Sequence, residues 1–204
     1  MIETLLSFAL ATLILAISPG PDNIFVLTQS IVNGKKYGLA TVLGLISGCL
    51  VHTTLLAFGV SLVIKQSETL FFIIKLFGAF YLFYLAYKVY KSDATILLSN
   101  ENIKQKTTKQ LFKQGFIMNV LNPKVSIFFL AFFPGFLFSE TLSSVLQFYI
   151  LGFIFMTVSL VIFSSIAILA GLISIRIKEN SKIGLYLKWL QIVVFVSISI
   201  FILT

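Results

Sequence analysis

The chain has 204 residues, of which 58% are hydrophobic and only 11% are charged, and its mean hydropathy is +1.05. A soluble domain carries about a quarter charged residues, so this composition excludes a water-soluble fold and indicates an integral membrane protein. The 15 Lys and Arg residues, against 7 Asp and Glu, do not indicate nucleic-acid binding, because they are confined to short segments between apolar runs and report membrane topology instead.

The apolar runs are long enough to form helices that cross a membrane. A membrane helix needs roughly 20 apolar residues, and the period-2 alternation of a membrane barrel is absent from the sequence. The sequence therefore predicts an all-α integral membrane protein with six transmembrane helices, in the runs Ile2 to Val32, Tyr37 to Ile64, Thr69 to Tyr87, Leu111 to Phe138, Leu142 to Ile175 and Ile183 to Thr204. The first run carries Glu3 where a signal peptide would have a basic residue, so we expect it to remain in the mature protein.

Basic residues distinguish the two sides of the predicted bundle. They gather at the first, third and fifth junctions between runs, whereas the second and fourth junctions hold only Lys65. Cytoplasmic loops carry the excess of Lys and Arg, so we expect the odd junctions in the cytoplasm and both termini outside. The third junction is long and polar. We predict one transmembrane domain, 1–204, with a first repeat at 1–91, a cytoplasmic linker at 92–110 and a second repeat at 111–204.

The division into three plus three helices predicts two inverted repeats. Because each half contains an odd number of spans, two halves of like structure must cross the membrane in opposite directions, as in many secondary transporters. In such folds the first helix of each half is often broken near the middle of the membrane. Proline breaks are predicted in both of these helices, at Pro19-Gly20-Pro21 in the first run and at Asn122-Pro123-Lys124 in the fourth.

An ionisable residue adjoins each predicted break. At about 1.5 Å per helical residue, Asp22 and Lys124 both fall near the middle of a hydrocarbon core about 30 Å thick. A charge there costs at least ~2.5 kcal/mol unless it finds a partner or water. We therefore hypothesise that these two residues form a pair or alternate in a polar cavity between the broken helices. The alternative is a buried ion pair that only fixes the register of the helices.

Several neutral polar residues could serve the same region. Three side-chain amides are suited to satisfy freed backbone groups or a polar ligand: Asn23, Asn119 and Asn122. His52 could relay protons, since histidine titrates near neutral pH, or it could be a hydrogen-bonded packing residue, and the sequence leaves both roles open.

The same residues bear on other classes of function. His52 is the only histidine, and no second carboxylate lies deep in a span, so we expect no enzyme activity and no cofactor. Export of metal cations by a related fold is the alternative function, although a metal site would need several carboxylates, histidines or thiolates. Cys49 is the only cysteine, which excludes a disulfide within the chain. A purely structural protein would not need paired helix breaks with buried charges.

These motifs resemble those of one family. Ser18 to Pro21, Gly34 to Gly38 and Gly44 to Gly48 with His52 are similar to the N-terminal signature of the lysine exporter and homoserine-threonine resistance (LysE/RhtB) family, bacterial inner-membrane exporters of amino acids and their derivatives. Later matches are Lys75 to Ala79, Gly115 with Asn119, Asn122-Pro123-Lys124, and Pro134 with Phe136. The resemblance covers nearly the whole chain, and the last third matches only in character.

The resemblance implies a secondary transporter that exports amino acids or their derivatives from the cytoplasm, driven by the proton gradient or the membrane potential. It implies a multi-pass protein of the bacterial cytoplasmic membrane whose partners are an amino acid, protons and the lipid bilayer. Protonation of Asp22 would couple proton entry to substrate exit. Exposed faces of small residues would permit a homodimer. The expected substrate and proton pathway comprises Pro19, Gly20, Pro21, Asp22, Asn23, His52, Asn119, Asn122, Pro123 and Lys124.

Overall fold

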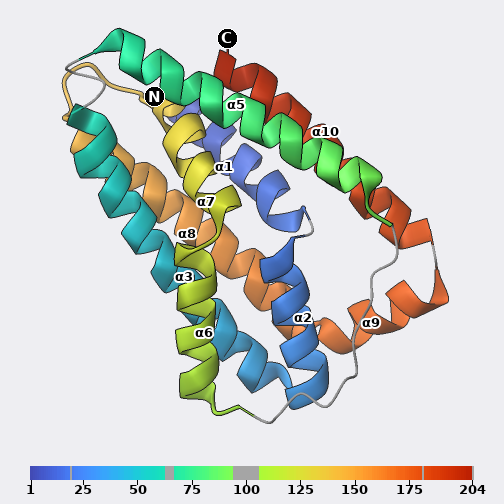
Figure 1. Cartoon of the computed structure of the whole chain (residues 1–204). Helices are drawn as coiled ribbons and strands as arrows, with labels where there is room; N and C mark the ends of the chain where they lie inside the picture. Colours follow the sequence, from blue (N-terminus) through green and yellow to red (C-terminus); the bar gives the residue numbers. More distant parts are fainter. Residues whose placement is uncertain (19, 63–66, 94–105, 181, 204) are drawn as a thin grey trace.

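The computed structural model describes residues 1–18, 20–62, 67–93, 106–180 and 182–203. Every regular element in these ranges is a helix (Figure 1), so the predicted all-α class is confirmed. The predicted site residue Pro19, Lys65 of the second junction and residues 94–105 of the predicted linker lie outside the described ranges.

The first half of the chain begins with a bent pair of helices. Helices α1 (Ile2–Ile17) and α2 (Pro21–Asn33) divide the first apolar run and are inclined at 57° to each other. Gly34 follows with a φ of 98°, a left-handed conformation that favours glycine and lets the chain reverse. The elements that complete this half are α3 (Lys35–Leu55), its π-helical continuation η1 (Leu56–Val60) and α5 (Glu68–Lys91).

The second half also begins with a bent helix. Helix α6 (Thr108–Val120) is inclined at 48° to the segment that follows it, which comprises α7 (Pro123–Ile127), the π-helical η2 (Phe128–Phe132) and the 3-10 helix η3 (Phe133–Phe136). Helix α6 begins inside the predicted linker, because the side chains and backbone amides of Thr107 and Gln110 form a reciprocal capping box. The remaining elements are α8 (Ser144–Ile168), α9 (Ala170–Glu179) and α10 (Lys182–Leu203).

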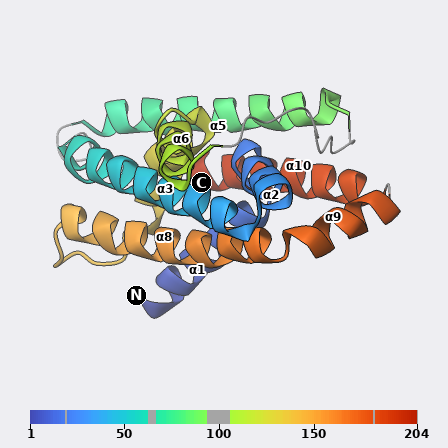
Figure 2. The same ribbon diagram turned by 90° about the horizontal axis from the view of Figure 1, so that it is seen from below.

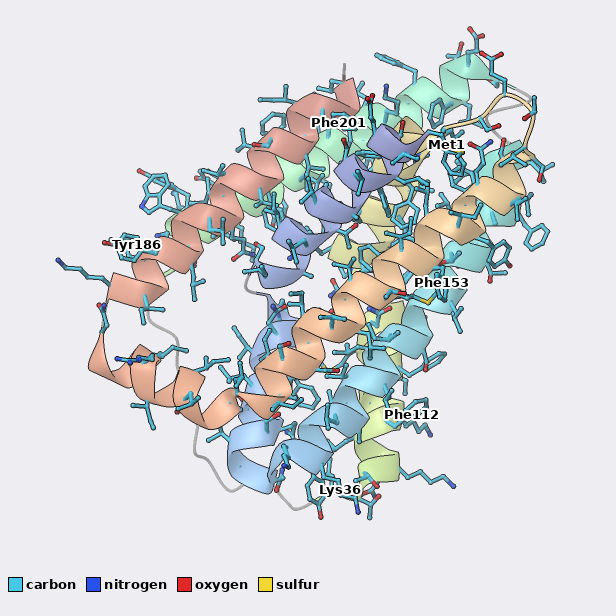
Figure 3. All side chains as sticks on the ribbon, turned by 180° about the vertical axis from the view of Figure 1, so that it is seen from behind. Met1, Lys36, Phe112, Phe153, Tyr186 and Phe201 are labelled. Atoms are coloured by element: carbon cyan, nitrogen blue, oxygen red, sulfur yellow. The ribbon has the colours of Figure 1, made fainter. Side chains whose placement is uncertain are left out.

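Between four and six segments can cross a membrane. Four continuous helical segments are long and apolar enough alone, and the two bent pairs bring the number to six if each pair crosses once. Both termini lie at the same end of the bundle (Figure 1), as an even number of crossings requires. Large aromatic side chains such as Phe153 of α8 and Tyr186 of α10 point outward (Figure 3), and both are about two-thirds exposed, which suits a surface in contact with lipid. The chain is therefore a multi-pass membrane protein.

One predicted span is interrupted at a position that no proline or charge in the sequence marks. The run Leu142 to Ile175 was expected to be a single helix, but α8 ends at Ile168 and Leu169 leaves helical geometry with φ −91° and ψ 9°. Helix α9 then turns away from α8 (Figure 1). The sequence of α9 carries Arg176 and Lys178, and such residues are driven out of an apolar layer. That tendency accounts for the turn, which needs neither proline nor glycine at position 169.

The helices pack in two groups around an aromatic core. Helix α3 packs against α6, α8 and α2, while α5 pairs with α10, and Figure 2 shows α5 and α8 on opposite sides of the bundle. Between them, η2 and η3 contribute phenylalanines that stack in register. The ring centroids of Phe129 and Phe133 are 4.1 Å apart, and those of Phe128 and Phe132 are 4.5 Å apart. All four rings are at most 2% exposed, so they form a rigid block behind the second helix break.

Helices α3 and α6 cross at closely facing glycines. A Cβ atom at Gly44 would overlap the carbonyl oxygen of Phe112, and a Cβ atom at Gly115 would overlap the carbonyl oxygen of Thr41. Backbone atoms cannot move aside as the end of a flexible side chain can. Glycine at both positions therefore sets the distance between the two helices.

We expect Gly115→Ala to lower the thermal midpoint of the purified protein, because the added methyl group would force α6 away from α3. Overpacking of this kind costs about 1–3 kcal/mol. The matched control is Gly59→Ala, since no atom of the described residues lies within 4 Å of a Cβ atom at that position. Thermal unfolding in detergent, followed by tryptophan fluorescence, measures both variants. Equal midpoints for the two would contradict the close crossing.

Candidate functional site

A small internal cavity lies where the two helix breaks meet. The α1–α2 connection and the start of α2 contribute Gly20 to Asn23, and the second break contributes Asn119, Asn122 and Lys124. Its volume is about 40 Å³, which is room for roughly three water molecules and far below the ~150 Å³ apolar cavity that admits benzene. In this conformation the cavity therefore has room for a few waters but not for a ligand the size of benzene.

Asp22 supplies the negative charge of the cavity. It is only 7% exposed and stands in the first turn of α2, where the positive end of the helix dipole favours a carboxylate. Asn122 Nδ2 donates a hydrogen bond of 3.2 Å to Asp22 Oδ2, across 100 residues of sequence. This hydrogen bond joins the two helix breaks directly.

Lys124 supplies the positive charge. Its Nζ lies 4.9 Å from the centroid of the Phe195 ring, in cation–π contact. The same nitrogen lies 3.3 Å from where a Cβ atom of Gly20 would stand, so glycine at position 20 leaves space for the ammonium. Asp22 and Lys124 both line the cavity, but these two described residues form no ion pair within 4.0 Å. The hypothesis that they pair or alternate stays a prediction.

Asn23 satisfies a carbonyl group that the first break frees. Because α1 ends at Ile17, the carbonyl of Ala16 lacks the amide that a continuing helix would offer four residues later. Asn23 Nδ2 donates to this oxygen at 2.8 Å. Pro21 has no amide hydrogen, but it stands in the first turn of α2, where that hydrogen would have no helical partner.

His52 performs the corresponding task at the second break. The carbonyl of Asn119 would accept from residue 123 in a continuous helix, but Pro123 has no amide hydrogen. It accepts instead from the backbone amide of Asn122, at 3.0 Å. His52 Nε2 lies 3.0 Å from that oxygen. A carbonyl oxygen only accepts, so Nε2 is the donor. Of the two roles left open by the sequence, this contact agrees with the hydrogen-bonded packing role.

The Asn119 side chain faces α3 as well. Its Oδ1 lies 3.7 Å from the thiol of Cys49, which can donate to it, and only 2.6 Å from where a Cβ atom of Gly48 would stand. Asn119 is 3% exposed. Its backbone and side chain thus hold α6 against α3 at the level of the cavity.

Seven of the ten predicted pathway residues line this cavity: Gly20, Pro21, Asp22, Asn23, Asn119, Asn122 and Lys124. His52 lies behind Asn119, Pro123 is exposed at the start of α7, and Pro19 lies outside the described residues.

Other lining residues were not anticipated. Cys49 could have been found, because it stands three residues before His52 on the same face of α3. Helix α8 contributes Phe155, Ser159 and Phe163, and no charge or proline marks that stretch of sequence. Within the described part of the chain, no three His, Cys, Asp or Glu side chains gather closely enough to hold a metal ion.

Comparisons with known proteins identify relatives of the chain. The family described as LysE type translocator matches residues 13–204. A homoserine/homoserine lactone efflux protein of Salmonella typhimurium strain LT2 is 30% identical over 172 residues, which cover 84% of this chain and 82% of that protein. A protein of the same name from Salmonella typhi is equally similar over the same shares of both chains. No solved structure matches the chain.

We expect His52→Leu to lower the thermal midpoint, because the carbonyl of Asn119 would lose its side-chain donor inside the bundle. The carbonyl keeps the backbone amide of Asn122 as a donor, at 3.0 Å, so the cost is that of one lost hydrogen bond, about 0.5–1.5 kcal/mol. His52→Gln should recover most of this loss, since the glutamine amide can donate to the same oxygen. Thermal unfolding in detergent compares the two variants with the unsubstituted protein. If both variants melt at the same lowered temperature, hydrogen bonding is not what His52 contributes.

Proposed function

The chain belongs to the LysE type translocator family, and from this membership we propose that it is a secondary transporter that exports amino acids or their derivatives from the cytoplasm. The name of the two Salmonella relatives, homoserine/homoserine lactone efflux protein, supports this class of substrate. One structural observation gives this proposal its strongest support. A carboxylate and an ammonium, on Asp22 and Lys124, line one cavity between two broken helices.

The chemistry of the cavity suits a zwitterion. An amino acid presents a carboxylate, which Lys124 and the positive end of the α2 dipole would attract. It also presents an ammonium, which Asp22 would attract. Each group of the substrate would replace a contact that the cavity now makes internally, such as the hydrogen bond from Asn122 to Asp22. The present volume of about 40 Å³ is too small for such a ligand, so binding requires the two breaks to separate.

We further propose that α1–α2 and α6–η3 are corresponding helices of an inverted repeat, with the cavity near the middle of the bilayer. Both pairs are bent, by 57° and 48°, and each break has a carbonyl satisfied by a side-chain donor, from Asn23 or His52. The distribution of basic residues supports cytoplasmic odd junctions and external termini, in the bacterial cytoplasmic membrane.

Coupling to protons is proposed for Asp22. It is the buried acid at the meeting point of the two breaks, and its protonation after the substrate leaves would neutralise the site for the return step. Protons would then move inward as the amino acid moves outward.

We expect Asp22→Asn to abolish export driven by a pH gradient, down to the level of protein-free vesicles, while counterflow of a labelled amino acid continues. The amide keeps the shape and hydrogen-bonding capacity of the side chain but cannot carry the proton. Proteoliposomes loaded with labelled homoserine measure both modes. Glu68→Gln is the control, since Glu68 is an exposed acid at the start of α5 and its loss should change neither mode. Gradient-driven export that survives Asp22→Asn would rule out Asp22 as the coupling group.

The alternative function, export of metal cations, makes a different prediction for cells. Cells that lack the gene should be more sensitive to dipeptides that raise internal amino acid concentrations, and expression of the gene should restore growth. Expression should leave growth in metal salts unchanged. Protection against metal salts without protection against dipeptides would favour the cation exporter.

A further inference from the structure

A second and larger cavity lies beside the polar one. Its volume is about 310 Å³, and it is bounded by α2, α8, α9 and α10. In Figure 1 these elements surround the lower right part of the molecule. The walls are mainly aliphatic, and six of the residues that form them are Ile24, Leu27, Ile162, Ile166, Ile173 and Leu187.

Asn23 lies between the two cavities, because it lines both of them. Its amide is held by the carbonyl of Ala16, which also lines the polar cavity. Asp22 and Lys124 line the smaller cavity on one side of Asn23, and aliphatic residues line the larger cavity on the other side. A molecule with a charged head and an apolar side chain would match both sides at once.

We propose that the larger cavity receives the side chain of the exported molecule, and that the substrates are therefore amino acids with bulky aliphatic side chains. This inference rests on the proposed function, because it needs the polar cavity to hold the zwitterionic head. It goes beyond that function by selecting among amino acids.

The size and composition of the cavity support this class. It is about twice as large as an engineered apolar cavity of about 150 Å³ that binds benzene, so a leucine-sized side chain fits. Among the described residues of its wall, Asn23 and Ser165 are polar and none is charged. A charged side chain would therefore lose its hydration without finding a partner. Each buried methylene favours binding by about fourfold, which gives leucine an advantage over homoserine.

The test uses two substitutions that reduce the volume of the larger cavity, one on each of two helices. Ile166→Phe adds volume from α8, and Ile24→Phe adds it from α2. The matched control is Ile168→Phe, the same substitution on the same helix at a position that is 58% exposed and does not line the cavity.

Proteoliposomes of each variant are assayed for counterflow of labelled leucine and labelled homoserine. We expect the unsubstituted protein to prefer leucine. The two cavity variants should weaken the apparent affinity for leucine by about fifteenfold, the loss of roughly two buried methylenes, and should change that for homoserine by less than about twofold. The control should change neither. Thermal unfolding in detergent first shows whether each variant has folded, and Ile24→Phe remains informative if Ile166→Phe does not fold.

Three results would overturn the inference. They are an equal loss for both substrates in the cavity variants, no loss for either, and a preference for homoserine in the unsubstituted protein. An equal loss is the result expected if a lipid chain occupies the cavity. These results leave amino acid export standing, because homoserine is still exchanged. If the unsubstituted protein exchanges no amino acid at all, the proposed function itself fails.

Discussion

The structure depends on one constraint, which is that a break in a membrane helix frees backbone carbonyls that lipid cannot satisfy. Because α1 ends at Ile17, the carbonyl of Ala16 has no helical partner. Because Pro123 has no amide hydrogen, the carbonyl of Asn119 accepts from the backbone amide of Asn122 instead. Side chains donate to both oxygens, Asn23 to that of Ala16 and His52 to that of Asn119. Asn23 lies on α2 and so joins the two parts of the first break, whereas His52 lies on α3 and ties the second break to that neighbouring helix. The same ties bring the polar side chains of both breaks into one cavity.

The helices around the cavity follow from that arrangement. The glycines on α3 and α6 allow the close crossing that brings His52 within reach of the second break. Both α3 and α7 then continue into π-helical segments, η1 and η2, which contact each other. π-Helical turns are frequent next to functional sites because they shift the register of the residues that follow. Here the π-helical η2 contains three of the four stacked phenylalanines, and their packed rings support the second break.

Much of this could be predicted from the sequence, for a physical reason. Charge and proline are costly in an apolar run, so Asp22, Lys124 and the prolines beside them stand out without any alignment. The cavity lining from α8 could not be predicted, since Phe155 and Phe163 look like ordinary lipid-facing residues until the helix is placed. The end of α8 at Ile168 could not be predicted either. The residues that account for the turn are the basic residues of α9, and they lie several positions after the bend. Sequence also could not decide the partner of His52, which depends on the crossing of α3 and α6.

The small volume of the polar cavity has a consequence for the membrane in which the protein resides. A continuous file of water conducts protons, and any such file through the bundle would dissipate the gradient on which the cell depends. The cavity between the two breaks has room for roughly three waters, and Asn122 and Phe195 engage the Asp22 and Lys124 side chains that line it. The meeting point of the two breaks thus limits how much water can enter the bundle at this level.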